Sequence, residues 1–162
     1  MLARLRYETV GTEVFMIKWI ILRLALVAIA AWQGWMGGDG WLPTRPITPL
    51  MLAGMVAYGL VAIPVVAWAQ RLNPRNNPVW HFPSWGLNPL TLRDPLQFFH
   101  MIGFLFTAAG AGVAAHDWWL KLPLRLPHGV LPAFGLGMVA GTYLAAVIFR
   151  GKLVPNTPAS GS

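Results

Sequence analysis

The sequence predicts an all-α integral membrane protein with four transmembrane helices. Four long apolar stretches lead to this prediction, at residues 14–36, 50–69, 98–115 and 130–149. Each approaches the ~20 residues that cross ~30 Å of hydrocarbon as a helix. Hydrophobic residues make up 56% of the chain and charged residues only 10%, whereas soluble domains carry roughly 25% charged residues. We expect one membrane domain over residues 1–152 and a disordered tail over residues 153–162.

The positive charges favour one orientation. The N-terminus, the loop after the second stretch and the C-terminal tail together hold Arg4, Arg6, Arg71, Arg75, Arg93, Arg150 and Lys152. The other two loops hold only Arg45, Lys121 and Arg125. The positive-inside rule then places both termini and the middle loop in the cytoplasm, as in a bacterial inner membrane protein. Because the basic residues flank apolar spans, the net charge of +7 fits acidic lipid headgroups and not nucleic acid.

The first stretch contains two cations, Lys18 and Arg23, toward its cytoplasmic end. A charge within the membrane is by default a functional hypothesis. If hydrocarbon begins near Trp19, however, Arg23 lies only about one helical turn deep. We therefore expect both side chains to snorkel to the headgroups. The alternative is that Lys18, Arg23 and His100 bind a lipid headgroup or another ligand, with Asp94 near enough to approach Arg23.

The second and third stretches have marked beginnings. Thr48-Pro49 and Asp94-Pro95 each place a capping oxygen before a proline, whose missing N–H costs nothing in a first turn. The two halves of the chain also share a weak pattern, Asp39-Gly40-Trp41-Leu42 and Asp117-Trp118-Trp119-Leu120. These halves form two hairpins, and the pattern permits either a parallel duplication or chance recurrence in a biased composition.

The fourth stretch carries a smooth stripe of small residues spaced four apart: Ala133, Gly137, Gly141 and Ala145. Small residues let a second helix approach closely in lipid. The stripe predicts a contact surface, either with another helix of this chain or with another subunit.

The middle loop, residues 70–97, is long for a compact domain, which suggests a function. Its prolines prevent a regular helix, and it carries Trp80 and Trp85 among several apolar side chains. Three interpretations remain open. The loop lies in the headgroup layer, docks a partner through its tryptophans, or folds back to form a site.

Metal and cofactor chemistry has little support. The chain has no cysteine, which excludes disulfides, thiolate zinc sites and iron–sulfur clusters. His100 and His116 bracket the third stretch at opposite ends, which does not suit a haem held by two histidines. Asp39, His116, Asp117 and His128 could meet at the outer face as metal ligands, although capping of helix ends explains them equally well. No cofactor is expected, and no motif indicates an enzyme.

The function expected from these features is that of a small accessory or assembly subunit of a larger membrane complex. Its partners would be membrane lipids and other membrane subunits or further copies of itself. One alternative is a small transporter or a lipid- or quinone-binding protein. A second is a membrane enzyme that uses the outer His/Asp cluster as a metal site.

Overall fold

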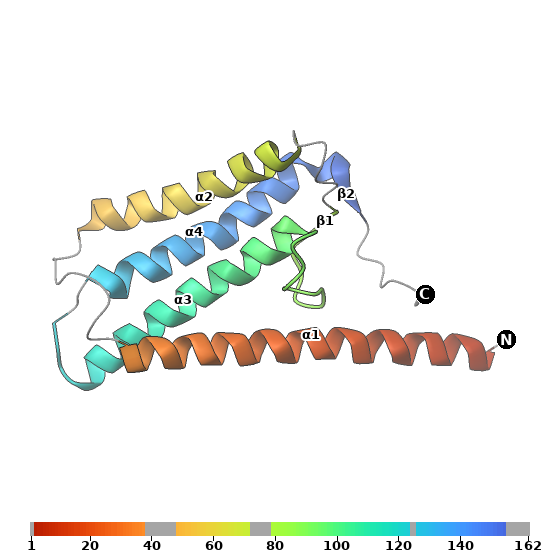
Figure 1. The fold of residues 1–162 in the computed structure, drawn as a ribbon, viewed down its shortest axis with the longest axis horizontal. Helices are drawn as coiled ribbons and strands as arrows, with labels where there is room; N and C mark the ends of the chain where they lie inside the picture. Colours follow the sequence, from red (N-terminus) through yellow and green to blue (C-terminus); the bar gives the residue numbers. More distant parts are fainter. Residues whose placement is uncertain (1, 38–47, 72–78, 124–125, 155–162) are drawn as a thin grey trace.

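In the computed structural model the described residues form four long helices and one very small sheet (Figure 1). The structure describes residues 2–37, 48–71, 79–123 and 126–154, with the side chains of all of these except 2–15, 71, 126, 127, 152 and 154. The helices are α1 (Leu2–Gly37), α2 (Pro49–Arg71), α3 (Pro95–Trp119) and α4 (Leu126–Ile148). A 3₁₀ turn η1 (Arg150–Lys152) and the strands β1 (Trp80–His81) and β2 (Leu153–Val154) complete the described elements.

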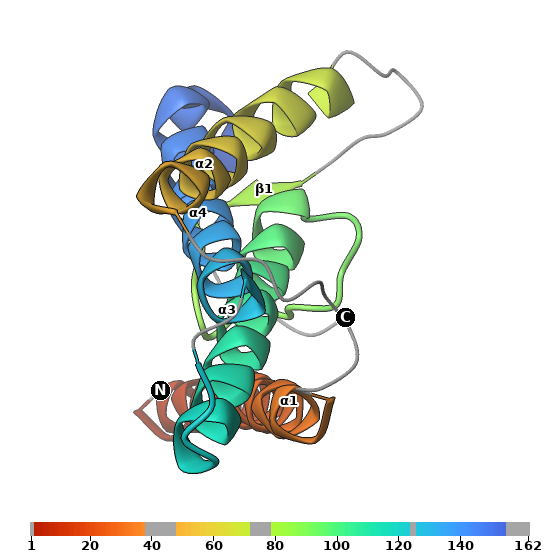
Figure 2. The same cartoon turned by 90° about the vertical axis from the view of Figure 1, so that its left-hand side faces the viewer.

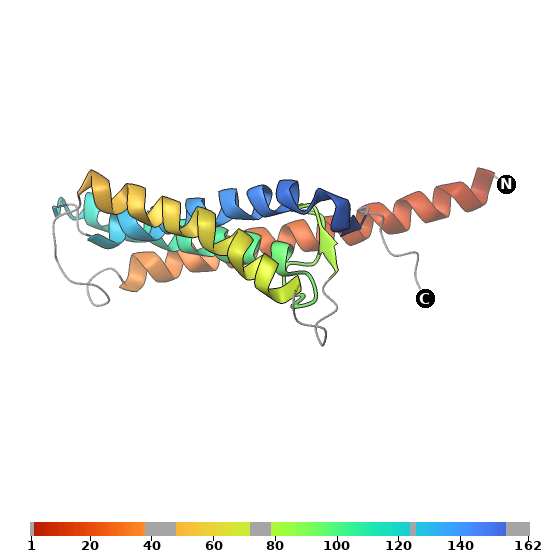
Figure 3. The same ribbon diagram turned by 90° about the horizontal axis from the view of Figure 1, so that it is seen from above.

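The four predicted stretches all lie in helices long and apolar enough to cross a membrane. These segments are Met16–Gly37, Pro49–Gln70, Pro95–Trp119 and His128–Ile148. The all-α prediction is therefore confirmed, and the segment limits differ from the predicted ones by a few residues at most. The helix α1 continues well before its apolar segment, so its N-terminal part extends past the ends of the other helices (Figures 1 and 3).

Both predicted helix beginnings are observed. Thr48 accepts a hydrogen bond from the backbone N–H of Met51 at 3.3 Å, in front of Pro49. Asp94 accepts from the backbone N–H of Gln97 at 3.3 Å, in front of Pro95. Each side chain satisfies an N–H that the first helical turn would leave unpaired.

The helices lie in a single row in the order α2, α4, α3, α1 (Figure 2). The packed neighbours are α2 with α4, α4 with α3, and α3 with α1. Consecutive helices α3 and α4 form an antiparallel hairpin, whereas α1 and α2 lie at opposite edges of the row. The two halves of the chain therefore pack differently, and their weak sequence similarity has no counterpart in the packing.

Glycines make these helix contacts close. A Cβ on Gly137 would overlap the carbonyl oxygen of Val56, and one on Gly141 would lie 2.7 Å from the carbonyl oxygen of Gly59. A Cβ on Gly112 would overlap the carbonyl oxygen of Ala31. Gly137 and Gly141, half of the predicted stripe, thus pack against α2 of the same chain. This is the close backbone approach that small residues permit between membrane helices.

A buried apolar cluster holds α2, α3 and α4 together at the ends of these helices that meet the middle loop. It consists of Ile63, Ala67, Trp80, Leu96, Met138, Ala145, Ala146 and Phe149. The rings of Trp80 and Phe149 meet edge to face, with centroids 4.9 Å apart. Ala133 and Ala145, the other members of the stripe, are also buried.

The tail expected to be disordered from residue 153 begins with an ordered pair of residues. Leu153 and Val154 form β2, which pairs in parallel with Trp80 and His81 of β1. The backbone hydrogen bonds of this pairing and the partial burial of Leu153 against the apolar cluster explain the order. The rest of the predicted tail, residues 155–162, lies outside the described residues.

Candidate functional site

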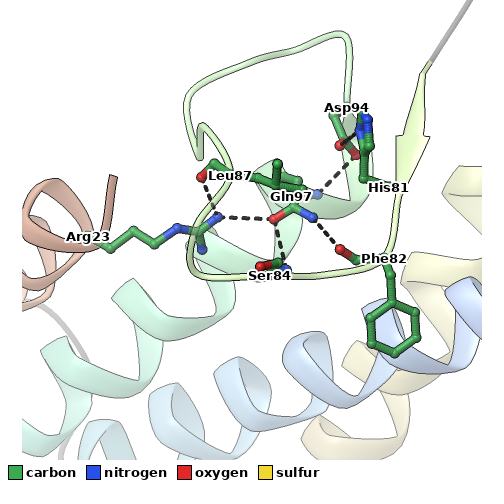
Figure 4. Close-up of polar contacts among 7 residues, drawn as sticks. All are labelled: Arg23, His81, Phe82, Ser84, Leu87, Asp94 and Gln97. Carbon is green, nitrogen blue, oxygen red and sulfur yellow. Dashed lines mark hydrogen bonds and ion pairs between the residues drawn. The ribbon is translucent and has the colours of Figure 1, made fainter. Parts of the chain in front are cut away.

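A buried polar cluster joins α1, α3 and the middle loop. Its centre is Arg23, whose exposed fraction is 0%. One guanidinium nitrogen donates to Oε1 of Gln97 at 3.0 Å and to the carbonyl oxygen of Leu87 at 3.2 Å. The other terminal nitrogen lies 3.3 Å from Nδ1 of His100. Figure 4 shows the side chain reaching from α1 to the loop and to the first turn of α3.

This geometry overturns the expectation that Arg23 snorkels to the headgroups. The middle loop folds over the guanidinium and supplies a carbonyl acceptor, so the side chain has partners inside the protein and no need of water. Gly86 makes this cover close, because a Cβ there would lie 3.3 Å from the side chain of Met16 on α1. Lys18, by contrast, is exposed on α1, and its ammonium lies 5.0 Å from the ring centre of Trp19.

Gln97 is the connecting residue of the cluster, and sequence reasoning did not identify it. Besides accepting from Arg23, its Oε1 accepts from the backbone N–H of Ser84 at 3.2 Å. Its Nε2 donates to the carbonyl oxygen of Phe82 at 2.8 Å. A single buried amide therefore holds Arg23 and two positions of the middle loop (Figure 4). The available signal was a polar residue in the first turn of an otherwise apolar helix.

Asp94 does not contact Arg23 directly. Its Oδ2 lies 2.8 Å from Nδ1 of His81, while its Oδ1 accepts from the backbone of Gln97. Burial raises the pKa of the Asp94 carboxyl above its ordinary value, and the hydrogen bonds from His81 and Gln97 oppose that rise. The one carboxylate expected to approach Arg23 is thus engaged by a histidine and linked to Arg23 only through Gln97.

His100 connects the cluster to α4. Its Nε2 lies 3.2 Å from the hydroxyl oxygen of Tyr143. Its ring also meets Phe104 and Tyr143 nearly perpendicularly, with centroids 5.0 and 5.4 Å away. His100 is completely buried, so among the described residues its two ring nitrogens face a donor-only guanidinium and a phenol. Tyr143 is a second residue that the sequence analysis missed.

The tryptophans of the middle loop are part of this internal structure. Trp80 is only 4% exposed, which overturns its interpretation as an exposed anchor for a partner. Trp85 is partly buried, with its ring 4.9 Å from that of Phe104 and 5.8 Å from the guanidinium carbon of Arg23. Apolar contact with the helix ends explains both positions. The described part of the loop thus folds back against the helices, through the contacts of Phe82, Ser84 and Leu87 with Gln97 and Arg23.

A second polar cluster lies at the opposite ends of α3 and α4, where α3 ends and α4 begins. The two carboxyl oxygens of Asp117 face two histidines, His116 Nδ1 at 3.0 Å and His128 Nε2 at 2.7 Å. Asp117 is fully buried, and His128 is 7% exposed. The fourth predicted ligand, Asp39, lies outside the described residues. Within the described part of the chain, no group of three or more His, Asp or Glu side chains has an arrangement that could hold a metal ion. The contact between Asp117 and His128 ties α3 to α4.

No protein-family model matches the chain, and no curated protein or solved structure matches it either.

Proposed function

We propose that the chain is a small integral membrane protein that serves as an accessory or assembly subunit of a larger membrane complex. The observation that supports this function is the single row of helices. A row has two broad faces and two edges, and each helix in it packs closely against only one or two others. Such a layer leaves much apolar surface exposed on its helices, so it is suited to lying against other membrane-embedded surfaces.

The exposed side chains of the row agree with this role. Large apolar residues face outward on all four helices, among them Ile21 on α1, Val61 on α2, Trp118 on α3 and Val147 on α4. Lipid tails satisfy such residues, and so do the helices of a partner. The proposed setting is the bacterial inner membrane, with both termini and the middle loop in the cytoplasm, because the basic residues are concentrated on that side.

The test is gentle extraction from native membranes in mild detergent, followed by size measurement and mass spectrometry of everything that co-purifies. Stoichiometric membrane proteins, or a defined multiple of this chain, are the expected result. The variants Ala57→Trp and Ala28→Trp place bulk on exposed positions of α2 and α1, so they should weaken association without unfolding the chain. A single chain that carries only lipid would contradict the subunit role.

A lipid- or quinone-binding protein is the second candidate, and the buried Arg23 favours it. The guanidinium is held by uncharged partners, Gln97, Leu87 and His100. A cation that the protein keeps inside the membrane without a carboxylate against it is expensive, and such residues commonly mark ligand sites. Lipid or quinone that co-purifies stoichiometrically with the wild type and is lost from Arg23→Leu would support this candidate. Co-purification unchanged by the substitution would contradict it.

A further inference from the structure

Arg23 is a buried cation whose charge is not balanced by the groups it touches. Its Nε has no hydrogen-bond partner among the described residues, and its terminal nitrogens contact only an amide, a carbonyl and an imidazole. It also lies beside the first turns of α3, where the helix dipole is positive. Asp94, the acid at that end of α3, is paired with His81. None of the groups that touch Arg23 is thus an anion, and an anion from outside the chain would be attracted to its charge.

The contacts of Arg23 fix the proton positions on His100. A guanidinium donates hydrogen bonds and accepts none. Nδ1 of His100 must then be the acceptor of the 3.3 Å contact with Arg23, which leaves the ring proton on Nε2. That N–H donates to the hydroxyl oxygen of Tyr143, 3.2 Å away. The chain of hydrogen bonds thus runs in one direction, from Arg23 through His100 to Tyr143.

Tyr143 ends this chain with an unused donor. Because His100 donates to its oxygen, the hydroxyl proton of Tyr143 must point elsewhere, and no described residue accepts it. Hydrogen bonds in series polarise one another, which strengthens the last donor. Tyr143 is 37% exposed on α4, with the exposed ring of Phe82 at a centroid distance of 5.6 Å. Part of the Tyr143 side chain is therefore accessible from outside the protein, next to the apolar ring of Phe82.

The position along the helix suits a lipid headgroup. Tyr143 lies five residues before the end of α4 at Ile148, about 8 Å along the helix axis. A tyrosine at this depth places its hydroxyl near the boundary between hydrocarbon and headgroups. The exposed Arg93 and Arg150 flank the same ends of α3 and α4. Their charges add to the attraction of an acidic headgroup.

We propose that the Tyr143 hydroxyl donates to a phosphate oxygen of an acidic phospholipid in the cytoplasmic leaflet, and that Arg23 polarises and orients this donor through its hydrogen bond to His100. Tyr143 is the contacting residue, and Arg23 and His100 are positioning residues. The site rests on the second candidate function and names its ligand class. It does not depend on whether the chain is a subunit of a larger complex.

The test compares lipid binding by the wild type, Tyr143→Phe and Tyr58→Phe in detergent. Lipid retention is measured by native mass spectrometry with phosphatidylglycerol and phosphatidylcholine of identical acyl chains. The wild type should prefer phosphatidylglycerol, and Tyr143→Phe should lose about tenfold or more of that preference, because a hydrogen bond to a charged group is lost. Tyr58, 65% exposed on α2 with its ring stacked on Phe134, is the matched control and should leave the preference unchanged.

Further variants and measurements distinguish the possible outcomes of this experiment. Arg23→Lys should keep most of the preference for phosphatidylglycerol, and Arg23→Gln should lose it. If Tyr143 only stabilised the fold, the charge at position 23 would not change this preference. Nitrogen chemical shifts of His100 should report a proton on Nε2. Equal preference in Tyr143→Phe and Tyr58→Phe would overturn the site. Binding of inorganic phosphate that depends on the Tyr143 hydroxyl would also overturn the lipid assignment, since the ligand would then be a soluble anion. Partners that still co-purify with Tyr143→Phe would leave the subunit role intact.

Discussion

Arg23 and Gln97 are 74 positions apart in the chain and are joined by a buried hydrogen bond of 3.0 Å. The contact links the first membrane helix to the beginning of the third, and Gln97 passes it on to the middle loop through Ser84 and Phe82. One charged side chain and one amide thus fasten three segments that are distant in sequence.

Arg23→Leu should lower the free energy of unfolding by about 2–4 kcal/mol, because Gln97, His100 and the Leu87 carbonyl lose their donor inside the protein. Lys18→Leu is the control, since Lys18 is exposed on the same helix and should change stability by less than about 0.5 kcal/mol. Unfolding by sodium dodecyl sulfate in mixed micelles measures both. Equal, small effects would show that the buried contacts of Arg23 do not stabilise the fold.

Gly137→Ala should destabilise the protein by about 1–3 kcal/mol, because the added methyl group would overlap the backbone of Val56 on α2. Gly54→Ala is the matched control in the same helix pair. No atom lies within 4 Å of a Cβ built there, so the higher helix propensity of alanine should stabilise α2 by about 0.5–1 kcal/mol. Thermal unfolding in detergent distinguishes them. The same sign for both variants would argue against the α2–α4 contact.

Trp80→Ala should cost about 3–5 kcal/mol of stability, since the side chain is 4% exposed and packs on Phe149 in the apolar cluster. Trp68→Ala provides the comparison, because Trp68 is 53% exposed on α2. Protection of the loop from limited proteolysis should fall in the first variant alone. A tolerant Trp80→Ala would return this residue to the surface role expected from the sequence.

Asp94 should make stability fall as the pH rises. Burial raises its pKa in the folded protein above the ordinary 3.8, so the folded state binds the proton more tightly than the unfolded state does. Between 3.8 and the folded value, unfolding releases that proton, and this contribution to stability decreases with increasing pH. Below 3.8 both states hold the proton, and the contribution is fully present.

The variant Asp94→Asn isolates this effect. Asparagine retains an N-cap acceptor for Gln97 but does not titrate. Unfolding followed from about pH 3 to pH 7 should show a smaller decline in the variant than in the wild type. A difference between the two proteins that stays constant over this range would exclude the titration of Asp94 as its source.

The sequence predicted the helices better than their arrangement. The apolar stretches and the two proline-marked beginnings follow from local chemistry, so the limits of α2 and α3 were accessible. The order α2, α4, α3, α1 could not be predicted. Gly112 and Gly137 indicate that a helix packs closely against them, but the sequence does not show which helix that is. Arg23 was misread for a related reason. The carbonyl of Leu87 and the amide of Gln97 that satisfy it come from segments that no local pattern connects to α1.

The placement of α1 at the edge of the row also sets an order of events during synthesis. Helix α1 is synthesised first, whereas its neighbour α3 is the third helix to be synthesised. The groups that accept hydrogen bonds from Arg23 belong to Leu87, Gln97 and His100. Until those residues have been synthesised, the Arg23 side chain has none of these partners. The earliest helix therefore completes its buried contacts only after the third has begun, so the chain finishes folding at its beginning.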